Sequence, residues 1–311
     1  MPQQTTSTIL MVRPANFGFN PETAESNFYQ KRDARSAQEV NTAAQKEFDA
    51  FVSLLEQKGV DIIVVEDTVS PAKTDAVFPN NWFSTHQNGK VVLYPMFSPN
   101  RREERRMDIM ELLMKRGFQV DEIVDLTFFE KDGQFLEGTG SLILDRVNKV
   151  AYACKSVRTH EVPMDYFCRL MGYEKVMFDA AQTIDGIVTS IYHTNVMMHI
   201  GSELAIVCLD SISVATEKLK LQEHLEKTGK KMIPITEKQK FNFAGNMLEV
   251  KNKDGAKITV MSKSASESLG DVQLNAIKRY TDVLVPDLST IEKLGGGSAR
   301  CMMAEIFLPS V

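Results

Sequence analysis

The chain has little of what marks several classes of protein. Its 311 residues include only four cysteines (Cys154, Cys168, Cys208 and Cys301) with no CxxC spacing, so neither a disulfide framework nor a metal site is expected. No apolar run approaches the ~20 residues of a membrane span, and the N-terminus lacks the basic and apolar regions of a secretory signal. We therefore expect a cytoplasmic protein with free thiols and no membrane partner.

The chain also lacks the cationic surface of a nucleic-acid-binding protein. Its 36 lysines and arginines are outnumbered by 41 aspartates and glutamates, and the cations are spread out except for a cluster at 101–106. Hydrophobic residues make up 43% and charged residues 25%, which is typical of a soluble globular protein. These figures argue against nucleic acid as a partner. A small molecule is the expected ligand, and a homo-oligomer is left open.

What the chain does contain is a repeated pattern of two short apolar strands joined by a turn. The pattern is predicted at residues 77–95, 135–153, 192–208 and 243–261. Helix-like segments follow or separate these units at 103–115, 164–171, 212–225 and 266–280. A fifth copy at 299–306 lacks its second strand, which the first predicted strand, at 9–13, could supply. A helix at 37–58 and a strand at 61–66 lie between that first strand and the first repeat.

The residues that open the first strand of each unit recur with a period near 50 residues. They are Asn81, Gly140, Asn195, Asn246 and Cys301, separated by 59, 55, 51 and 55 residues. Such a period predicts a modular or propeller-like array. Five units whose last copy is completed by the N-terminus describe a closed ring without edge strands. Their opening loops would gather at one end of the ring, where a small-molecule site is expected.

The last unit begins with a run of three glycines, Gly295 to Gly297, followed by Cys301. We expect a flexible loop that lets the backbone approach a ligand and delivers the cysteine to the start of a strand. The alternative is an ordinary glycine turn, with Cys301 as a small buried hydrophobic residue.

If the five openings converge, they gather a thiol, an imidazole and a carboxylate from distant parts of the chain. Cys301, His193 and Glu137 would then serve as nucleophile, acid–base group and orienting group. Taken singly, His193 could be a half-buried strand histidine and Glu137 a solvated turn residue. Their equivalent places in the repeat favour the catalytic interpretation.

The sequence resembles the amidinotransferase/arginine deiminase superfamily of guanidine-modifying enzymes over essentially the whole chain, 1–311. Cys301 matches the family nucleophile, His193 its His-x-Asp pattern, and Glu137 its acidic residue before glycine. The resemblance implies an α/β pentein fold, a fivefold pseudosymmetric ββαβ propeller closed by the N-terminal strand, in one domain. It further implies that Arg158, with Arg101 or Arg102, binds a substrate α-carboxylate. Phe78 and Gly297 are further candidate substrate contacts.

Two departures from this family indicate the substrate. Arginine-processing members hold the guanidinium with two aspartates, and the corresponding residues here are Asn81 and Asn195. A guanidinium has donors only, whereas a neutral ureido group has a carbonyl acceptor beside its N–H donors and suits asparagine. The chain therefore looks most similar to the branch that hydrolyses citrulline to ornithine, ammonia and carbon dioxide.

Three other functions stay open at this point. The same fold could serve an arginine or methylarginine deiminase, or an amidinotransferase. A protein of a different class, a catalytically silent pentein that binds a macromolecule, would lack the cysteine, histidine and acid. No metal or organic cofactor is expected for any of the enzymes.

Overall fold

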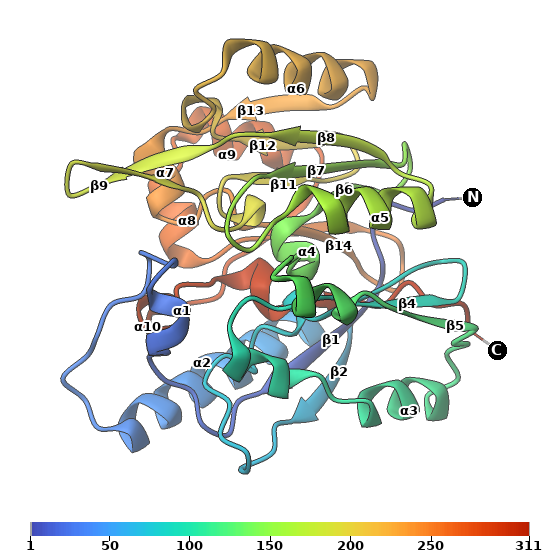
Figure 1. The fold of residues 1–311 in the computed structure, drawn as a ribbon, viewed down its shortest axis with the longest axis vertical. Helices are drawn as coiled ribbons and strands as arrows, with labels where there is room; N and C mark the ends of the chain where they lie inside the picture. The colour runs from blue at the N-terminus through green and yellow to red at the C-terminus, as the bar shows by residue number, and fades with distance from the viewer. Residues whose placement is uncertain (1, 311) are drawn as a thin grey trace.

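The computed structural model describes residues 2–310, and its main feature is a sheet topology repeated five times (Figure 1). In each three-stranded sheet the central strand pairs antiparallel with one neighbour and parallel with the other. The first four sheets are β3(Phe83–Thr85) β4(Lys90–Leu93) β5(Glu122–Asp125), β6(Ile143–Asp145) β7(Val150–Cys154) β8(Glu174–Phe178), β11(Met198–Ile200) β12(Leu204–Val207) β13(Lys231–Pro234), and β14(Leu248–Lys251) β15(Lys257–Val260) β16(Asp282–Leu284). The predicted repeat is confirmed.

The fifth sheet joins the two ends of the chain, as the sequence predicts. β1 (Thr8–Arg13) lies between β17 (Ala304–Glu305), with Ile9 opposite Glu305, and β2 (Asp61–Glu66), with Thr8 opposite Asp61. β1 is almost fully buried because it is paired on both sides. Within residues 2–310 the five sheets stay separate and form no continuous closed sheet, so closure into a propeller stays a prediction.

The long helix α2 (Ala37–Gln57) matches the predicted helix at 37–58 because strong local signals define both of its ends. Ser36 and Glu39 form a capping box at its start. Gly59, at φ +81°, reverses the chain into β2. One face of α2, which includes Ala44, Phe48 and Phe51, is buried in a core cluster that also contains Cys301.

The other helices differ from the sequence prediction mainly at their boundaries. The predicted helix at 266–280 is two helices, broken at Leu269 and Gly270, and that at 103–115 begins only at Asp108 after a 3₁₀ segment. A hairpin of β9 (Ala181–Ile184) and β10 (Ile187–Ser190) was not predicted. The remaining α-helices are α1(Pro21–Ala24), α3(Asp108–Lys115), α4(Gly138–Ser141), α5(Glu161–Met171), α6(Ala215–Lys227), α7(Glu237–Phe241), α8(Lys263–Ser268), α9(Asp271–Lys278) and α10(Ser289–Gly295).

The sequence analysis predicted that the five opening residues begin strands, and this prediction is wrong. Four lie in short helical turns just before the strand: η1 (Pro79–Asn81), α4, η4 (Thr194–Val196) and η6 (Ala299–Met302). The fifth, Asn246, lies in the loop before β14. The helical turns contact one another, η1 with α4 and η6, and α4 with η4. The expected convergence of these segments is therefore present, although through helical turns rather than strand ends.

Candidate active site

Cys301 lies in the 3₁₀ turn η6 with its side chain buried at the centre of the converging turns. Its Sγ accepts hydrogen bonds from Asn195 Nδ2 and Asn246 Nδ2, both at 3.3 Å. The Asn246 amide is held in this orientation because its Oδ1 accepts the Arg300 backbone N–H at 3.0 Å. Two amide N–H groups therefore donate to the sulfur atom. In a thiolate this atom carries the negative charge, so these hydrogen bonds would stabilise the thiolate form.

The glycine run before Cys301 is a buried helix end rather than the flexible loop that was predicted. Gly295 ends α10, and Gly296, at φ +62°, caps it and donates its N–H to the Glu292 carbonyl at 3.0 Å. A Cβ at Gly297 would lie 2.9 Å from the Phe78 ring and 3.3 Å from Cys301 Cβ. The glycines allow close packing of Phe78 beside the thiol, and the Gly296 N–H is not available to a ligand.

His193 and Glu137 form a buried pair beside the cavity. His193 Nε2 lies 2.7 Å from Glu137 Oε2, and the Phe97 backbone N–H donates to Glu137 Oε1 at 2.9 Å. Burial alone would raise the pKa of Glu137, but the Arg158 charge and the His193 hydrogen bond hold that pKa well below its usual range. Burial lowers the pKa of His193 to about 4, against the opposing effect of Glu137. A neutral imidazole thus donates from Nε2 to a carboxylate and keeps its Nδ1 lone pair.

The Nδ1 side of His193 packs tightly against a glycine, which gives a specific prediction. A Cβ at Gly140 would lie 2.4 Å from Asn81 Nδ2 and 2.8 Å from His193 Nδ1. We expect Gly140→Ala to displace both side chains and to lower kcat at least about 100-fold, the cost that a 1 Å misplacement can have. Gly270→Ala is the matched control, because the nearest atom to its Cβ lies at 3.8 Å. Equal rates for the two variants in a steady-state assay would contradict this packing argument.

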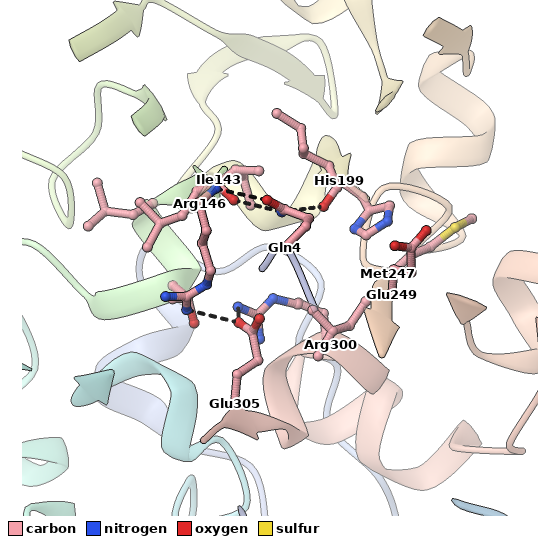
Figure 2. Close-up of a pocket in the computed structure, with 13 residues that line it drawn as sticks. Gln4, Ile143, Arg146, His199, Met247, Glu249, Arg300 and Glu305 are labelled. Atoms are coloured by element: carbon pink, nitrogen blue, oxygen red, sulfur yellow. Dashed lines mark hydrogen bonds and ion pairs between the residues drawn. The ribbon is translucent and has the colours of Figure 1, made fainter. Parts of the chain in front are cut away.

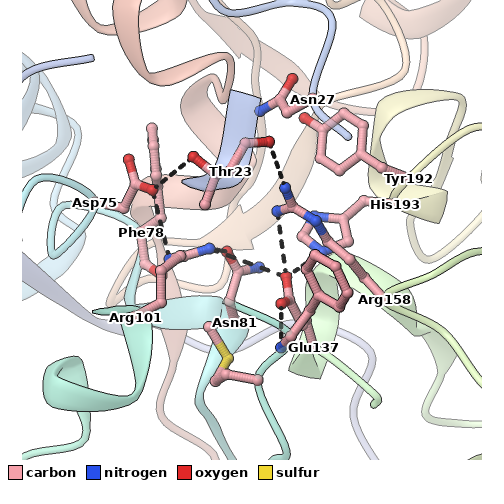
Figure 3. Close-up of polar contacts among 12 residues, drawn as sticks. Thr23, Asn27, Asp75, Phe78, Asn81, Arg101, Glu137, Arg158, Tyr192 and His193 are labelled. Atoms are coloured by element: carbon pink, nitrogen blue, oxygen red, sulfur yellow. Dashed lines mark hydrogen bonds and ion pairs between the residues drawn. The ribbon is translucent and has the colours of Figure 1, made fainter. Parts of the chain in front are cut away.

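Of the predicted arginines, Arg158 lies in the site and Arg102 does not. Arg158 Nη2 donates to the Thr23 carbonyl at 2.8 Å and to Ser26 Oγ at 2.7 Å, and its Nη1 lies 3.5 Å from Glu137 Oε2 (Figure 3). Arg102 instead donates to the Met96 carbonyl at 3.1 Å and is outside the set of residues that line the cavity.

Arg101, the other arginine that the sequence analysis left open beside Arg102, lines the cavity. In the 3₁₀ helix η2 (Pro99–Glu104), residues three apart lie on one face, so Arg101 and Glu104 point inward together while Arg102 points away. Arg101 Nε and Nη2 donate to the two oxygens of Glu104 at 2.9 and 2.8 Å, and Nη1 donates to Asn81 Oδ1 at 2.9 Å. Burial raises the pKa of Glu104 to about 7 despite this pairing.

Several buried polar atoms in this region have no hydrogen-bond partner within residues 2–310. They are Asn81 Nδ2 and Asn195 Oδ1 near the thiol, and Asp75 Oδ1 and Gln30 Oε1. Asp75 Oδ2 accepts from Asn20 Nδ2 at 2.7 Å, and burial raises the pKa of this carboxyl group. Buried polar atoms are rarely left unpaired, so these four mark positions where a polar ligand would bind.

One cavity collects most of the predicted residues. Its lining is Thr23, Asn27, Gln30, Asp75, Phe78, Asn81, Arg101, Arg158, Tyr192, His193, Gly295, Gly296, Gly297 and Cys301. Glu137 contacts His193 and Arg158, and Asn195 contacts Cys301, so both lie directly behind this lining. The sequence analysis missed Asp75, Gln30 and Glu104. It placed Asn246 among the repeat openings without assigning it to the site.

Two classes of feature are absent from the described part of the chain. Residues 2–310 contain no cluster of three or more histidine, cysteine or acidic side chains positioned to hold a metal ion. Among the same residues, none of the helices has the length and apolar character needed to cross a membrane. The cytoplasmic location and the homo-oligomer stay predictions.

The fold and the site define a class of protein, the cysteine-dependent hydrolases of the pentein superfamily that act on guanidino and related groups. The comparisons narrow this class to a family. Residues 13–308 match the family model described as N,N dimethylarginine dimethylhydrolase, eukaryotic, and the chain belongs to this family. The description of this family names a hydrolase of N,N-dimethylarginine. A search of curated proteins finds no match.

Solved structures of similar fold come from enzymes of low sequence identity. ArgZ, an arginine dihydrolase of the ornithine–ammonia cycle in cyanobacteria, is 19% identical with a TM-score of 0.72; the match covers 98% of this chain and 41% of that one. The ArgZ N-terminal domain bound to substrate is 18% identical with a TM-score of 0.70, over 97% and 99%. The Pseudomonas aeruginosa DDAH complexed with citrulline is 14% identical with a TM-score of 0.65, over 97% and 100%. The chain thus spans less than half of full-length ArgZ.

Proposed function

We propose that this protein hydrolyses citrulline to ornithine, ammonia and carbon dioxide. The observation that carries the proposal is the orientation of Asn81. Arginine has no acceptor, so the Asn81 atom that bonds Arg101 must be Oδ1, and the cavity atom must be the amide nitrogen. That nitrogen is a buried donor without a partner in residues 2–310. A ureido carbonyl can accept from it, whereas a guanidinium would leave it unpaired at a cost of about 1–3 kcal/mol.

The charges around the thiol also favour a neutral group. Glu137 already lies 3.5 Å from an Arg158 nitrogen and 4.0 Å from an Arg101 nitrogen, so its charge is balanced without a cationic substrate. A guanidinium would bring a third cation to this buried carboxylate. Asn195 Oδ1 is an unpaired buried acceptor that suits a ureido N–H.

Other cavity residues fit the amino-acid part of citrulline. Asp75 Oδ1 and Gln30 Oε1, both buried and unpaired, are acceptors for an α-ammonium group. Arg158 would bind the α-carboxylate in place of its present contacts with Thr23 and Ser26. Arg101 is fully engaged by Glu104 and Asn81, and in this proposal it orients Asn81 rather than binding the carboxylate.

The proposed reaction proceeds in two stages on Cys301. His193 first takes the Cys301 thiol proton on its free Nδ1 lone pair. The thiolate attacks the ureido carbon, the bond to the terminal nitrogen breaks, and His193 passes that proton to the nitrogen, which leaves as ammonia. A thiocarbamate then links Cys301 to the substrate. His193 next removes a proton from water, which attacks the same carbon and expels the thiolate. The resulting carbamate loses carbon dioxide to give ornithine. Glu137 holds the imidazole throughout. We further propose that the five modules close into a ring around this site, as the resemblance to the pentein fold implies.

The proposal predicts a clear substrate preference. Citrulline, arginine and N,N-dimethylarginine are tested as separate substrates. The products measured are ornithine and ammonia from citrulline, citrulline and ammonia from arginine, and citrulline and dimethylamine from N,N-dimethylarginine. We expect citrulline to be turned over with a kcat/KM at least about 100-fold above that for either guanidino compound, since a mismatched polar group costs about 1–3 kcal/mol and the cation adds to it. We further expect Asn81→Asp, which replaces the free donor by an acceptor, to lower kcat/KM for citrulline at least about tenfold.

The possible outcomes separate the alternatives. Faster turnover of arginine or dimethylarginine than of citrulline would overturn the interpretation of Asn81 while keeping the fold and the cysteine chemistry. No turnover of any of the three compounds would contradict the proposed reaction and would favour a binding protein.

A further inference from the structure

A second cavity, which we call the basic pocket, is lined by His86, Arg146, Lys149, Tyr173, Phe307 and three side-chain amides. In the described part of the chain it has no lining residue in common with the active-site cavity. Its lining includes two cationic side chains and, among residues 2–310, no carboxylate. The positive charges of Arg146 and Lys149 are therefore not neutralised by any other residue that lines the basic pocket.

The guanidinium of Arg146 is buried and shares its carboxylate partner. Arg146 Nη2 lies 3.4 Å from Glu305 Oε2, and the same oxygen accepts from Arg300 Nη2 at 2.9 Å (Figure 2). Arg146 Nη1 donates to the Thr85 carbonyl at 3.3 Å, and its guanidinium carbon lies 4.0 Å from the centre of the Phe307 ring. One carboxylate thus serves two guanidiniums, and Arg146 is held rigidly with surplus positive charge.

Lys149 adds a second cation on the turn between β6 and β7. Its Nζ lies 4.6 Å from the centre of the Tyr173 ring. Burial and the Arg146 charge both lower the pKa of Lys149. Burial, then the charges of Arg146 and Lys149, lower the pKa of His86 as well. The two cations therefore act on the same pocket, where His86 is neutral and its Nε2 lies 2.9 Å from Ser84 Oγ.

We propose that the basic pocket binds a small oxyanion, inorganic phosphate or a carboxylate. Arg146 and Lys149 supply charge-assisted donors, and the amides and His86 supply neutral ones. Arg146 is already fixed by Phe307 and Glu305, so binding costs little ordering of that side chain. The pocket volume of about 210 Å³ lies below the roughly 300–1,000 Å³ of sites for larger organic ligands. The fit is therefore to a small anion rather than to a nucleotide.

Calorimetric titration of the full chain with sodium phosphate, and separately with sodium acetate, tests this site. We expect one saturable site for at least one of the two anions, and the tighter of the two identifies the ligand source. Lys149→Asn should weaken binding at least tenfold. Lys149 has φ +57°, which asparagine tolerates well, so this variant is expected to fold. The matched control is Lys155→Gln, because Lys155 is a half-buried lysine paired with Asp179 at 3.8 Å outside the basic pocket. This variant should bind within twofold of wild type.

Two results would overturn the proposal. One is the absence of saturable binding for both anions. The other is binding that Lys149→Asn leaves unchanged, because the anion would then occupy another cationic site, such as Arg158 in the active-site cavity. Neither result bears on citrulline hydrolysis, so this proposal and the proposed function are tested independently.

Discussion

Cys301→Ala is expected to abolish turnover, with a fall in kcat of at least about 10⁴-fold, because removing a covalent nucleophile forfeits nearly all of the chemistry that depends on it. The substitution would also remove the sulfur acceptor of two amides. Asn246 Nδ2 would keep its bond to the Asn195 carbonyl at 3.1 Å, whereas Asn195 Nδ2 would lose its acceptor. No other thiol lines the cavity in residues 2–310, so none can replace it. The measurement is ammonia release under saturating substrate, with the unfolding temperature recorded for each variant.

Cys168→Ala is the matched control for this experiment. Cys168 is also a buried free thiol, but it lies on α5 within a separate core cluster. Burial raises its pKa to about 12, so it stays a thiol at neutral pH. Loss of this side chain should cost stability and leave kcat within about twofold of wild type. A Cys301→Ala protein with more than about one hundredth of wild-type activity would contradict the proposed nucleophile.

Much of the fold follows from local sequence signals. The five-unit repeat and the exchange of the terminal strand were predictable because each unit carries the same alternation of apolar strand, turn and helix. The helix boundary at Gly59 was predictable because glycine tolerates the positive φ that ends a helix. The hairpin of β9 and β10 was also predictable from the sequence, since an Asp-Gly pair, Asp185 and Gly186, forms its turn. This hairpin is therefore specified by its local sequence.

The site was predictable only where the repeat specified it. Cys301 and Asn195 occupy equivalent places in two units, and His193 lies two residues before Asn195. The structure brings all three together. Arg101 was not distinguishable from Arg102 because the choice depends on a 3₁₀ helix, whose period of three differs from that of an α-helix. Asp75 and Gln30 were missed because they reach the cavity from irregular segments outside the repeat. No periodicity indicates which way such side chains point.

The sequence analysis placed the glycine run correctly beside Cys301 but gave the wrong physical reason for its glycines. Three glycines before a cysteine indicated a flexible loop. The structure instead requires glycine at 295 and 297 because the Phe78 ring leaves no room for a side chain there. The close approach is between parts of the protein, and it packs the pocket wall beside the thiol. Sequence alone does not distinguish close approach to a ligand from close approach to an aromatic ring.

Glu137→Gln is expected to have the second largest effect, because one carboxylate holds three other groups. Its Oε2 contacts His193 at 2.7 Å, Arg158 at 3.5 Å and Arg101 at 4.0 Å. Glutamine keeps the shape but removes the charge, which leaves two buried guanidiniums less compensated and the imidazole less firmly held. We expect kcat to fall about 10²–10⁴-fold, the range of acid–base catalysis, and stability to fall by about 3 kcal/mol.

Glu130→Gln is the matched control that separates the effect of Glu137→Gln on kcat from its effect on stability. Glu130 resembles Glu137 in that it accepts a neighbouring backbone N–H, from Met96 at 2.9 Å, and pairs with two arginines, Arg102 and Arg105. It does not line the cavity. This variant should lower the free energy of unfolding and leave kcat nearly unchanged, in denaturant titrations and steady-state assays run side by side. If Glu137→Gln affects stability alone, as its control does, Glu137 is a structural ion-pair partner and His193 works without it.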